Sequence, residues 1–248
     1  MTDLAARGIA VYAYDAYGHG KSEGPRALVT RFSDLVDDYL ARLQQTKELI
    51  VSRVSSGAWS SPPPLFACGH SLGGLTAATA AVQDASGLAG LLVLSPAMDV
   101  PWTPSLRVLA LVGSAMARIT PRARLVPAVR PEDMNPIPER VREYVEDPLN
   151  TVGNVCAATG NETLKAFRAL ERSRSRLKLP LFAHHGAVDK CTYPPGTEAF
   201  VEGAGSADKT LKLYPGGFHE VMFGPEAVLV RRNVADWILA RARAAPKL

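Results

Sequence analysis

The sequence contains no long hydrophobic run. No stretch of about 18 or more apolar residues occurs in its 248 residues, so the sequence predicts no transmembrane helix. The opening residues, MTDLAARGIA, have neither the basic segment nor the long apolar segment of a secretory signal peptide. From these absences we expect a cytoplasmic location, with peripheral contact with membranes as an open alternative.

Cysteine is scarce as well. The three cysteines are Cys68, Cys156 and Cys191, and they are widely separated. An odd number of distant cysteines is typical of reduced thiols in a reducing compartment, and no pair has the spacing of a metal site. We therefore expect no disulfide framework, no bound metal and no cofactor.

An excess of charge of one sign is also lacking. The chain has 28 basic and 24 acidic residues, a net charge of +4, and 47% hydrophobic residues. So mild a charge does not call for a nucleic-acid partner, and none is predicted. The length and the apolar content suit a single α/β domain with a sizeable core.

Segments with strand character alternate with segments of helical periodicity. The apolar, β-rich segments are residues 8–16, 65–71, 90–97, 179–189 and 209–217, and the helical segments are 31–50, 73–84 and 225–243. This alternation predicts a parallel sheet with helices on both faces. In such sheets the chemistry lies at the carboxyl ends of the strands.

The stretch GHSLG, residues 69–73, separates an expected strand from an expected helix. It fits the G-x-S-x-G pattern of a nucleophile elbow, in which a sharp turn exposes the serine at the end of the sheet. Neighbouring glycines relieve the crowding at such a turn. The alternative is a glycine-rich turn with an incidental serine. The strand, turn and helix context favours Ser71 as a nucleophile.

Two further residues complete a catalytic pattern. Asp189 follows one expected strand and His219 follows another, so the order along the chain is serine, aspartate, histidine. A serine needs an imidazole to take its proton, and the imidazole needs a carboxylate to fix its tautomer. Taken singly, Asp189 in a loop is typically solvated and His219 after a turn is typically structural. The remaining histidines lack the triad position and are interpreted as structural or supporting: His19, His70, His184 and His185.

With these motifs in place, the sequence resembles the monoacylglycerol lipase-like α/β-hydrolases, also grouped as the serine aminopeptidase S33 or hydrolase-4 type. The resemblance covers nearly the whole chain. The matching stretches are YDAYGHGKSEGPR (14–26), GHSLGG (69–74), LVLSPAM (92–98), YVEDPL (144–149), HGAVDKC (185–191) and YPGGFHE (214–220). The resemblance implies an α/β-hydrolase fold, a mostly parallel sheet flanked by helices, with core residues 1–98 and 179–248 and a helical cap insertion at 99–178.

The resemblance also implies roles for individual residues. Ser71 would be the nucleophile, Asp189 the acid and His219 the base, and the backbone N–H of Leu72 would be an oxyanion donor. Tyr144 occupies the place of a cap tyrosine near the alcohol end of the substrate. The alternative for Tyr144 is a packed aromatic side chain of the cap.

The predicted cap, residues 99–178, shows no strand pattern. It is rich in proline at first and then helical. Its apolar side chains predict either an inner face that guides an acyl chain or ordinary packing against the body: Leu106, Leu109, Leu111, Val112 and Met116. The cap is also basic, with Arg118, Arg122, Arg124, Arg130, Arg168, Arg172, Arg174, Arg176 and Lys178. These charges predict either peripheral contact with an anionic membrane or a solvated face.

The start of the chain departs from the family pattern. Members of the family begin with a hairpin and a third strand that ends in a His-Gly motif, whose loop supplies a second oxyanion N–H. This sequence opens at MTDLAARG, which resembles the end of the helix that follows. The resemblance therefore implies an N-terminally truncated chain, and we expect the 248 residues to form a weak or inactive hydrolase of poor solubility.

Two classes of function remain open from the sequence. The first is an esterase or lipase that cleaves a monoacylglycerol or lysophospholipid through an acyl-serine intermediate. The second is a catalytically impaired or non-catalytic ligand-binding chain of the same fold. The elbow at Ser71 and the partners Asp189 and His219 favour the first, and the departure at the N-terminus favours the second.

Overall fold

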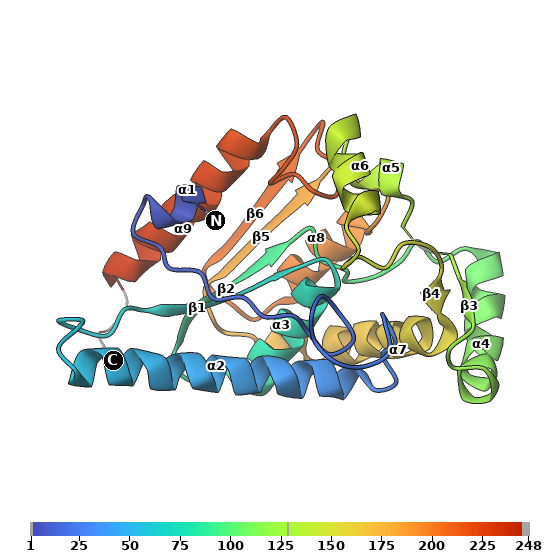
Figure 1. Cartoon of the computed structure of the whole chain (residues 1–248), viewed down its shortest axis with the longest axis horizontal. Helices are drawn as coiled ribbons and strands as arrows, with labels where there is room; N and C mark the ends of the chain where they lie inside the picture. Colours follow the sequence, from blue (N-terminus) through green and yellow to red (C-terminus); the bar gives the residue numbers. More distant parts are fainter. Residues whose placement is uncertain (1, 128, 245–248) are drawn as a thin grey trace.

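The centre of the molecule is a sheet of four parallel strands. The computed structural model describes residues 2–127 and 129–244. The spatial order of the strands is β1-β2-β5-β6 (Figure 1). Their bounds are β1 Leu65–His70, β2 Leu88–Leu94, β5 Leu181–Gly186 and β6 Lys209–Tyr214. Each overlaps a predicted strand, and the predicted parallel α/β arrangement is confirmed.

Helices cover both faces of this sheet. The face with α2 (Phe32–Ser55), α3 (Leu72–Gln83) and α8 (Pro194–Gly203) lies opposite the face with α9 (Ala227–Ala244) and the short α1 (Thr2–Ala5) (Figure 1). The three predicted helices are confirmed as α2, α3 and α9. Within the described part of the chain, no helix combines the length and hydrophobicity that a bilayer crossing requires.

The core is divided between the two faces residue by residue. Leu91 and Val93 of β2 pack on the side of α3, whereas Leu92 and Leu94 pack toward Trp237 of α9. Successive side chains of a strand point to opposite faces, so a strand covered on both faces is apolar throughout. Burial of each such leucine contributes about 1.5–3 kcal/mol. The continuous apolar run in β2 thus follows directly from its central position.

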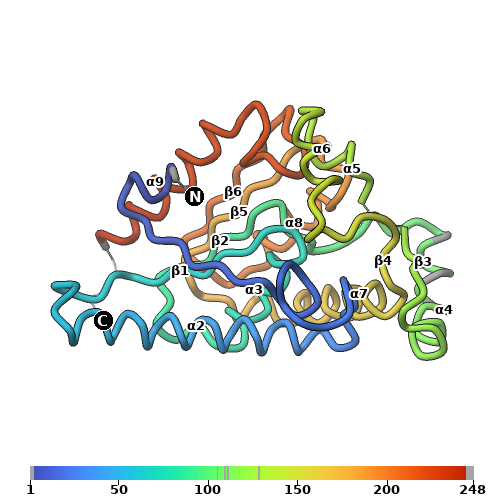
Figure 2. Tube along the Cα trace, in the orientation of Figure 1, coloured from blue at the N-terminus to red at the C-terminus, as the bar shows by residue number. Residues whose placement is uncertain are grey.

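The predicted strand at residues 8–16 is wrong. These residues form a coil between α1 and the loop before α2 (Figure 2). A strand needs a neighbour to pair with its N–H and C=O groups, and no strand of the described residues pairs with this segment. On the adjoining edge of the sheet, the Tyr39 hydroxyl donates to the carbonyl of Cys68 and accepts from its N–H, both at 2.9 Å. Residues 8–16 therefore have the composition of a strand, but no strand of the described residues lies beside them to form backbone hydrogen bonds.

The predicted cap contains helices and also a small sheet. Its elements are α4 (Pro104–Ile119), β3 (Arg124–Val126), α5 (Pro131–Met134), α6 (Pro138–Glu146), β4 (Val155–Cys156), α7 (Ala157–Ser173) and a 3₁₀ turn at Arg174–Arg176. The expectation of no strand here is wrong, because β3 and β4 pair antiparallel. Strands of two and three residues are too short to show a periodic pattern. Helix α7 joins the main core through Phe167 and Leu170.

Candidate active site

The three predicted catalytic residues lie at one edge of the sheet. Ser71 follows β1 directly, Asp189 lies in the loop after β5, and His219 lies in the loop after β6. Parallel strands present their carboxyl ends on the same edge, so three distant segments of the chain meet there.

Ser71 sits at a strained corner between β1 and α3. Its backbone has φ 54° and ψ −123°, a region that non-glycine residues seldom adopt and that costs about 1–3 kcal/mol. A Cβ on Gly69 would lie 2.0 Å from the carbonyl oxygen of Gly73, and a Cβ on Gly74 would lie 2.6 Å from Pro96. A Cβ on Gly73 would meet open space among the described residues. The corner therefore requires Gly69 and Gly74, whereas the second glycine of the sequence pattern is sterically free.

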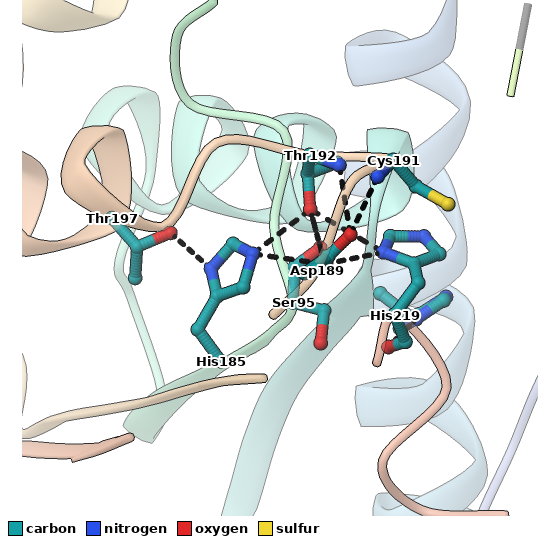
Figure 3. Close-up of polar contacts among 8 residues, drawn as sticks. Ser95, His185, Asp189, Cys191, Thr192, Thr197 and His219 are labelled. Carbon is teal, nitrogen blue, oxygen red and sulfur yellow. Dashed lines mark hydrogen bonds and ion pairs between the residues drawn. The ribbon is translucent and has the colours of Figure 1, made fainter. Parts of the chain in front are cut away.

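The carboxylate of Asp189 accepts five hydrogen bonds (Figure 3). Oδ1 accepts from the backbone N–H groups of Cys191 at 2.7 Å and Thr192 at 3.1 Å. Oδ2 accepts from His219 Nδ1 at 2.8 Å, His185 Nε2 at 3.0 Å and the Thr192 hydroxyl at 2.8 Å. The carboxylate is thus held in one orientation with one oxygen toward His219.

These donors also keep Asp189 ionised. Burial raises the pKa of Asp189, but the hydrogen bonds from His185 and His219 outweigh burial and lower the pKa below its usual range. An ionised carboxylate on Nδ1 leaves Nε2 of His219 free to accept a proton, and it stabilises the imidazolium that results.

The loop that carries His219 is pressed against the end of β5. A Cβ on Gly186 would lie 2.2 Å from the carbonyl oxygens of Gly217 and Phe218, so only glycine permits this approach. The N–H of Val188 donates to the Gly217 carbonyl at 3.1 Å. His219 is 2% exposed. The acid loop and the base loop are therefore fixed to each other.

Ser71 is connected to this pair through its sequence neighbour, His70. The ring of His70 lies 4.6 Å from the ring of His219, and His70 Nε2 lies 3.4 Å from the His219 carbonyl oxygen. No hydrogen bond joins Ser71 Oγ to His219 among the described residues. Such contacts are often long in an unliganded site and tighten in the complex. The structure thus joins acid to base and places the elbow next to them.

Tyr144 lies over the same edge, on α6. It is half-buried, and burial together with the charge of Glu220 and the nearby thiol of Cys191 raises the pKa of its hydroxyl. Tyr144 and Glu220 also line a small polar cavity of about 230 Å³ with residues of α6 and with Phe223. Glu220 follows His219 directly, so the cavity adjoins the catalytic edge.

One cluster at the site has the composition of a metal centre. Ligand atoms of Asp189, Cys191 and His219 lie within 4.8 Å of one another. Both oxygens of Asp189 already accept hydrogen bonds, so a metal would have to displace donors that hold the pair together. The side chains of Asp189, Cys191 and His219 are therefore arranged for proton transfer and fit a metal ion poorly.

Cys191 provides a test of access to the site. Burial and the carboxylates of Asp189, Asp133 and Glu220 raise the pKa of its thiol far above the usual range. Alkylation needs the thiolate. We therefore expect N-ethylmaleimide to block the site slowly at pH 7, with an inactivation rate that rises about tenfold per pH unit up to pH 9.

The control for this measurement is Cys191→Ser, which should remove the slow inactivation. Rapid inactivation that does not vary with pH, or equal sensitivity of Cys191→Ser, would contradict the expectation.

Two further residues hold the site together, and sequence reasoning did not name Thr192 and interpreted His185 only as structural or supporting. His185 and Thr192 both contact Asp189 Oδ2, and their own polar atoms lie 2.9 Å apart. The sequence pattern does not distinguish His185 from the other histidines outside the triad positions. Its spacing of four residues before Asp189 is the only signal, because nothing in the pattern shows on which side of β5 the ring lies.

Known proteins are similar to this chain in sequence and in fold. The sequence pattern that defines the family described as serine aminopeptidase, S33 (Hydrolase_4) matches residues 1–226. The chain is 30% identical to the monoglyceride lipase of Rattus norvegicus over 84% of its own length, and the match spans 65% of the rat protein. It is 28% identical to the monoacylglycerol lipase of Mycolicibacterium smegmatis over 96% of its own length and 80% of that protein.

A solved structure agrees with this comparison. The monoacylglycerol lipase of Paleococcus ferrophilus superposes with a TM-score of 0.78 at 27% identity, covering 97% of this chain and 87% of that one. A monoglyceride lipase variant of Saccharomyces cerevisiae superposes with a TM-score of 0.75 over 92% of this chain and 76% of that one, and at 21% identity it is evidence for the fold alone.

Proposed function

The chain belongs to the serine aminopeptidase S33 (Hydrolase_4) family and has the α/β-hydrolase fold, and from this premise we propose that it is a serine hydrolase acting on carboxylic esters of lipid-like substrates. The observation that carries the proposal is the 2.8 Å hydrogen bond between Asp189 and His219 beside the strained Ser71. The names of the relatives support a monoacylglycerol as substrate, with a lysophospholipid as the alternative.

The proposed reaction proceeds through an acyl-enzyme. Ser71 Oγ attacks the carbonyl carbon of the ester while His219 Nε2 takes the hydroxyl proton. Leu72 is the first residue of α3, so its N–H has no partner within the helix and is available to the oxyanion. The tetrahedral intermediate expels the alcohol, which receives the proton from His219. Water then attacks the acyl-Ser71 carbonyl by the same route and releases the carboxylic acid.

The polar cavity beside His219 is proposed to hold the departing alcohol. Tyr144 and Asn150 offer uncharged polar groups there, and the Asn150 amide is fixed by a hydrogen bond to the Tyr144 carbonyl at 3.0 Å. A glycerol head group carries two free hydroxyls that suit such partners. Tyr144 is thus proposed as a substrate-binding residue on the alcohol side.

Peripheral membrane contact through the cap is part of the proposal. Three apolar side chains of α4 are strongly exposed: Val108, Val112 and Ile119. Arg118, which precedes Ile119 in the chain, is exposed too. Leu106 and Met116 are partly buried, while the side chains of Leu109 and Leu111 lie outside the described residues. An exposed apolar stripe with basic neighbours is typical of a surface that contacts anionic lipid.

The test is release of fatty acid from defined lipids. We expect turnover of 1-monoacylglycerol, and faster turnover when it is presented in anionic vesicles than in neutral ones. Lysophosphatidylcholine in the same vesicles tests the alternative head group. Binding of a monoacylglycerol without release of fatty acid, together with no labelling by a fluorophosphonate, would instead indicate a ligand-binding chain.

A further inference from the structure

A second histidine, His185, contacts the catalytic carboxylate from the side opposite His219 (Figure 3). It lies on β5 and is fully buried. Its Nε2 is 3.0 Å from Asp189 Oδ2, and its Nδ1 is 2.8 Å from the Thr197 hydroxyl on α8. Every polar atom of this ring therefore has a partner.

The partners fix the tautomer of His185. A carboxylate only accepts hydrogen bonds, so Nε2 must carry a proton that it donates to Asp189. In the neutral ring Nδ1 then accepts, and the Thr197 hydroxyl is the donor it accepts from. The carboxylate of Asp189 thus selects the tautomer, and the Thr197 hydroxyl of α8, which can donate or accept, is oriented to donate to Nδ1.

We propose that His185 is a positioning residue, which holds Asp189 toward His219 and shares the charge of Oδ2 between two imidazoles. The inference rests on the proposed function of Asp189 and His219. Oδ2 divides its negative charge among three donors, which are His185 Nε2, Thr192 Oγ1 and His219 Nδ1. The more charge His185 takes, the less Asp189 stabilises a protonated His219.

A change at His185 should therefore move the pH profile in a known direction. In His185→Leu, Oδ2 has one donor fewer and stabilises the imidazolium of His219 more strongly. We expect the acidic limb of kcat/KM to move to higher pH by roughly 0.5–1 unit. We also expect kcat to fall roughly tenfold or more, because the carboxylate loses one of the contacts that aim it.

Other titratable and charged groups also face this cluster, and they are the same in the parent chain and in the variants at His185. They are His70 on β1, Tyr144 on α6, Asp133 on α5, and Lys190, Cys191 and Glu220 in the loops. Because these groups are common to the compared proteins, a difference between variants at His185 reports on His185.

The neighbouring residue His184 provides a matched control. It lies on the same strand and is equally buried, but its ring packs between Phe182 and Tyr214, and neither ring nitrogen has a partner among the described residues. His184→Leu should leave the acidic limb where it is. His185→Gln, which retains an N–H donor, should restore most of the activity lost in His185→Leu.

The experiment measures the pH profile and also the low-field proton resonance of the Asp189–His219 hydrogen bond. A shifted resonance in His185→Leu but not in His184→Leu supports the proposal. The resonance does not depend on turnover, so this result would stand even if the chain hydrolysed no ester and the proposed function failed. If His185→Leu does not fold, Thr197→Val removes the hydroxyl that hydrogen-bonds Nδ1 of His185 and holds its ring toward Asp189, and it should shift both readouts in the same direction. An unchanged limb and resonance in the folded variant overturn the proposal, as does a His185→Gln variant no better than His185→Leu.

Discussion

Replacement of Ser71 by alanine should abolish ester hydrolysis, with a fall in kcat of roughly 10⁶-fold. The methyl group leaves the strained backbone in place but removes the only atom of this residue that can form the acyl bond. His219 and Asp189 remain paired, so the fold should be unchanged. The measurement is fatty-acid release from monoacylglycerol together with labelling by a fluorophosphonate, and the label should disappear.

The matched control is Ser95→Ala. Ser95 stands at the end of the next strand, also has a positive φ of 41°, and its buried hydroxyl has no hydrogen-bond partner among the described residues. Its loss should leave both turnover and labelling unchanged. If Ser71→Ala were labelled as well as the parent chain, the nucleophile would have to be another residue.

The second large effect is expected for Asp189→Asn, which should lower kcat by roughly 10⁴-fold while Ser71 is retained. An amide in place of the carboxylate favours the wrong tautomer of His219. Asp189 accepts all five of its hydrogen bonds, so the NH₂ group of the asparagine would face hydrogen-bond donors in place of acceptors. We therefore expect a loss of about 1–3 kcal/mol in the free energy of unfolding as well.

This loss of stability should depend on pH. The pKa of Asp189 is lower in the folded chain than in the unfolded one, so its carboxylate stabilises the fold above the unfolded pKa of about 3.9 and ceases to do so as pH falls through the folded pKa. The difference in the free energy of unfolding between the parent chain and Asp189→Asn should therefore have its full size above about pH 5 and become smaller below it. Denaturant unfolding from pH 3 to pH 7 measures it, with Asp208→Asn, at an exposed ion pair with Arg241, as control. A kcat within tenfold of the parent chain would contradict the role of Asp189.

The parts of the site that could be predicted are those that depend on order along the chain. Apolar runs located β1, β2, β5 and β6, and a polar residue after such a run must lie at the edge where parallel strands end. Ser71, Asp189 and His219 were found in this way, although their roles stay predictions. These inferences need only local pattern and the rule that parallel strands share an edge.

The parts that could not be predicted depend on what lies beside a segment. Residues 8–16 have strand composition, yet no strand of the described residues pairs with them, and composition does not reveal a missing neighbour. The strands β3 and β4 are too short to be periodic. The link from His185 to Asp189 depends on which way one ring points, and Thr197, which contacts the other ring nitrogen, lies on a separate element, α8. These are tertiary facts with no signature in a single sequence.

The placement of the site also determines when it can exist during folding. Asp189 and His219 are 30 residues apart and lie after the paired strands β5 and β6, whereas His70, next to Ser71, contacts His219 across 149 residues. Closing so long a loop is slow, and parallel pairing requires a full crossover for each strand. We therefore expect Asp189 and His219 to meet early within the C-terminal part and Ser71 to join them only when the sheet is complete. Activity should accordingly recover after refolding later than helix content does.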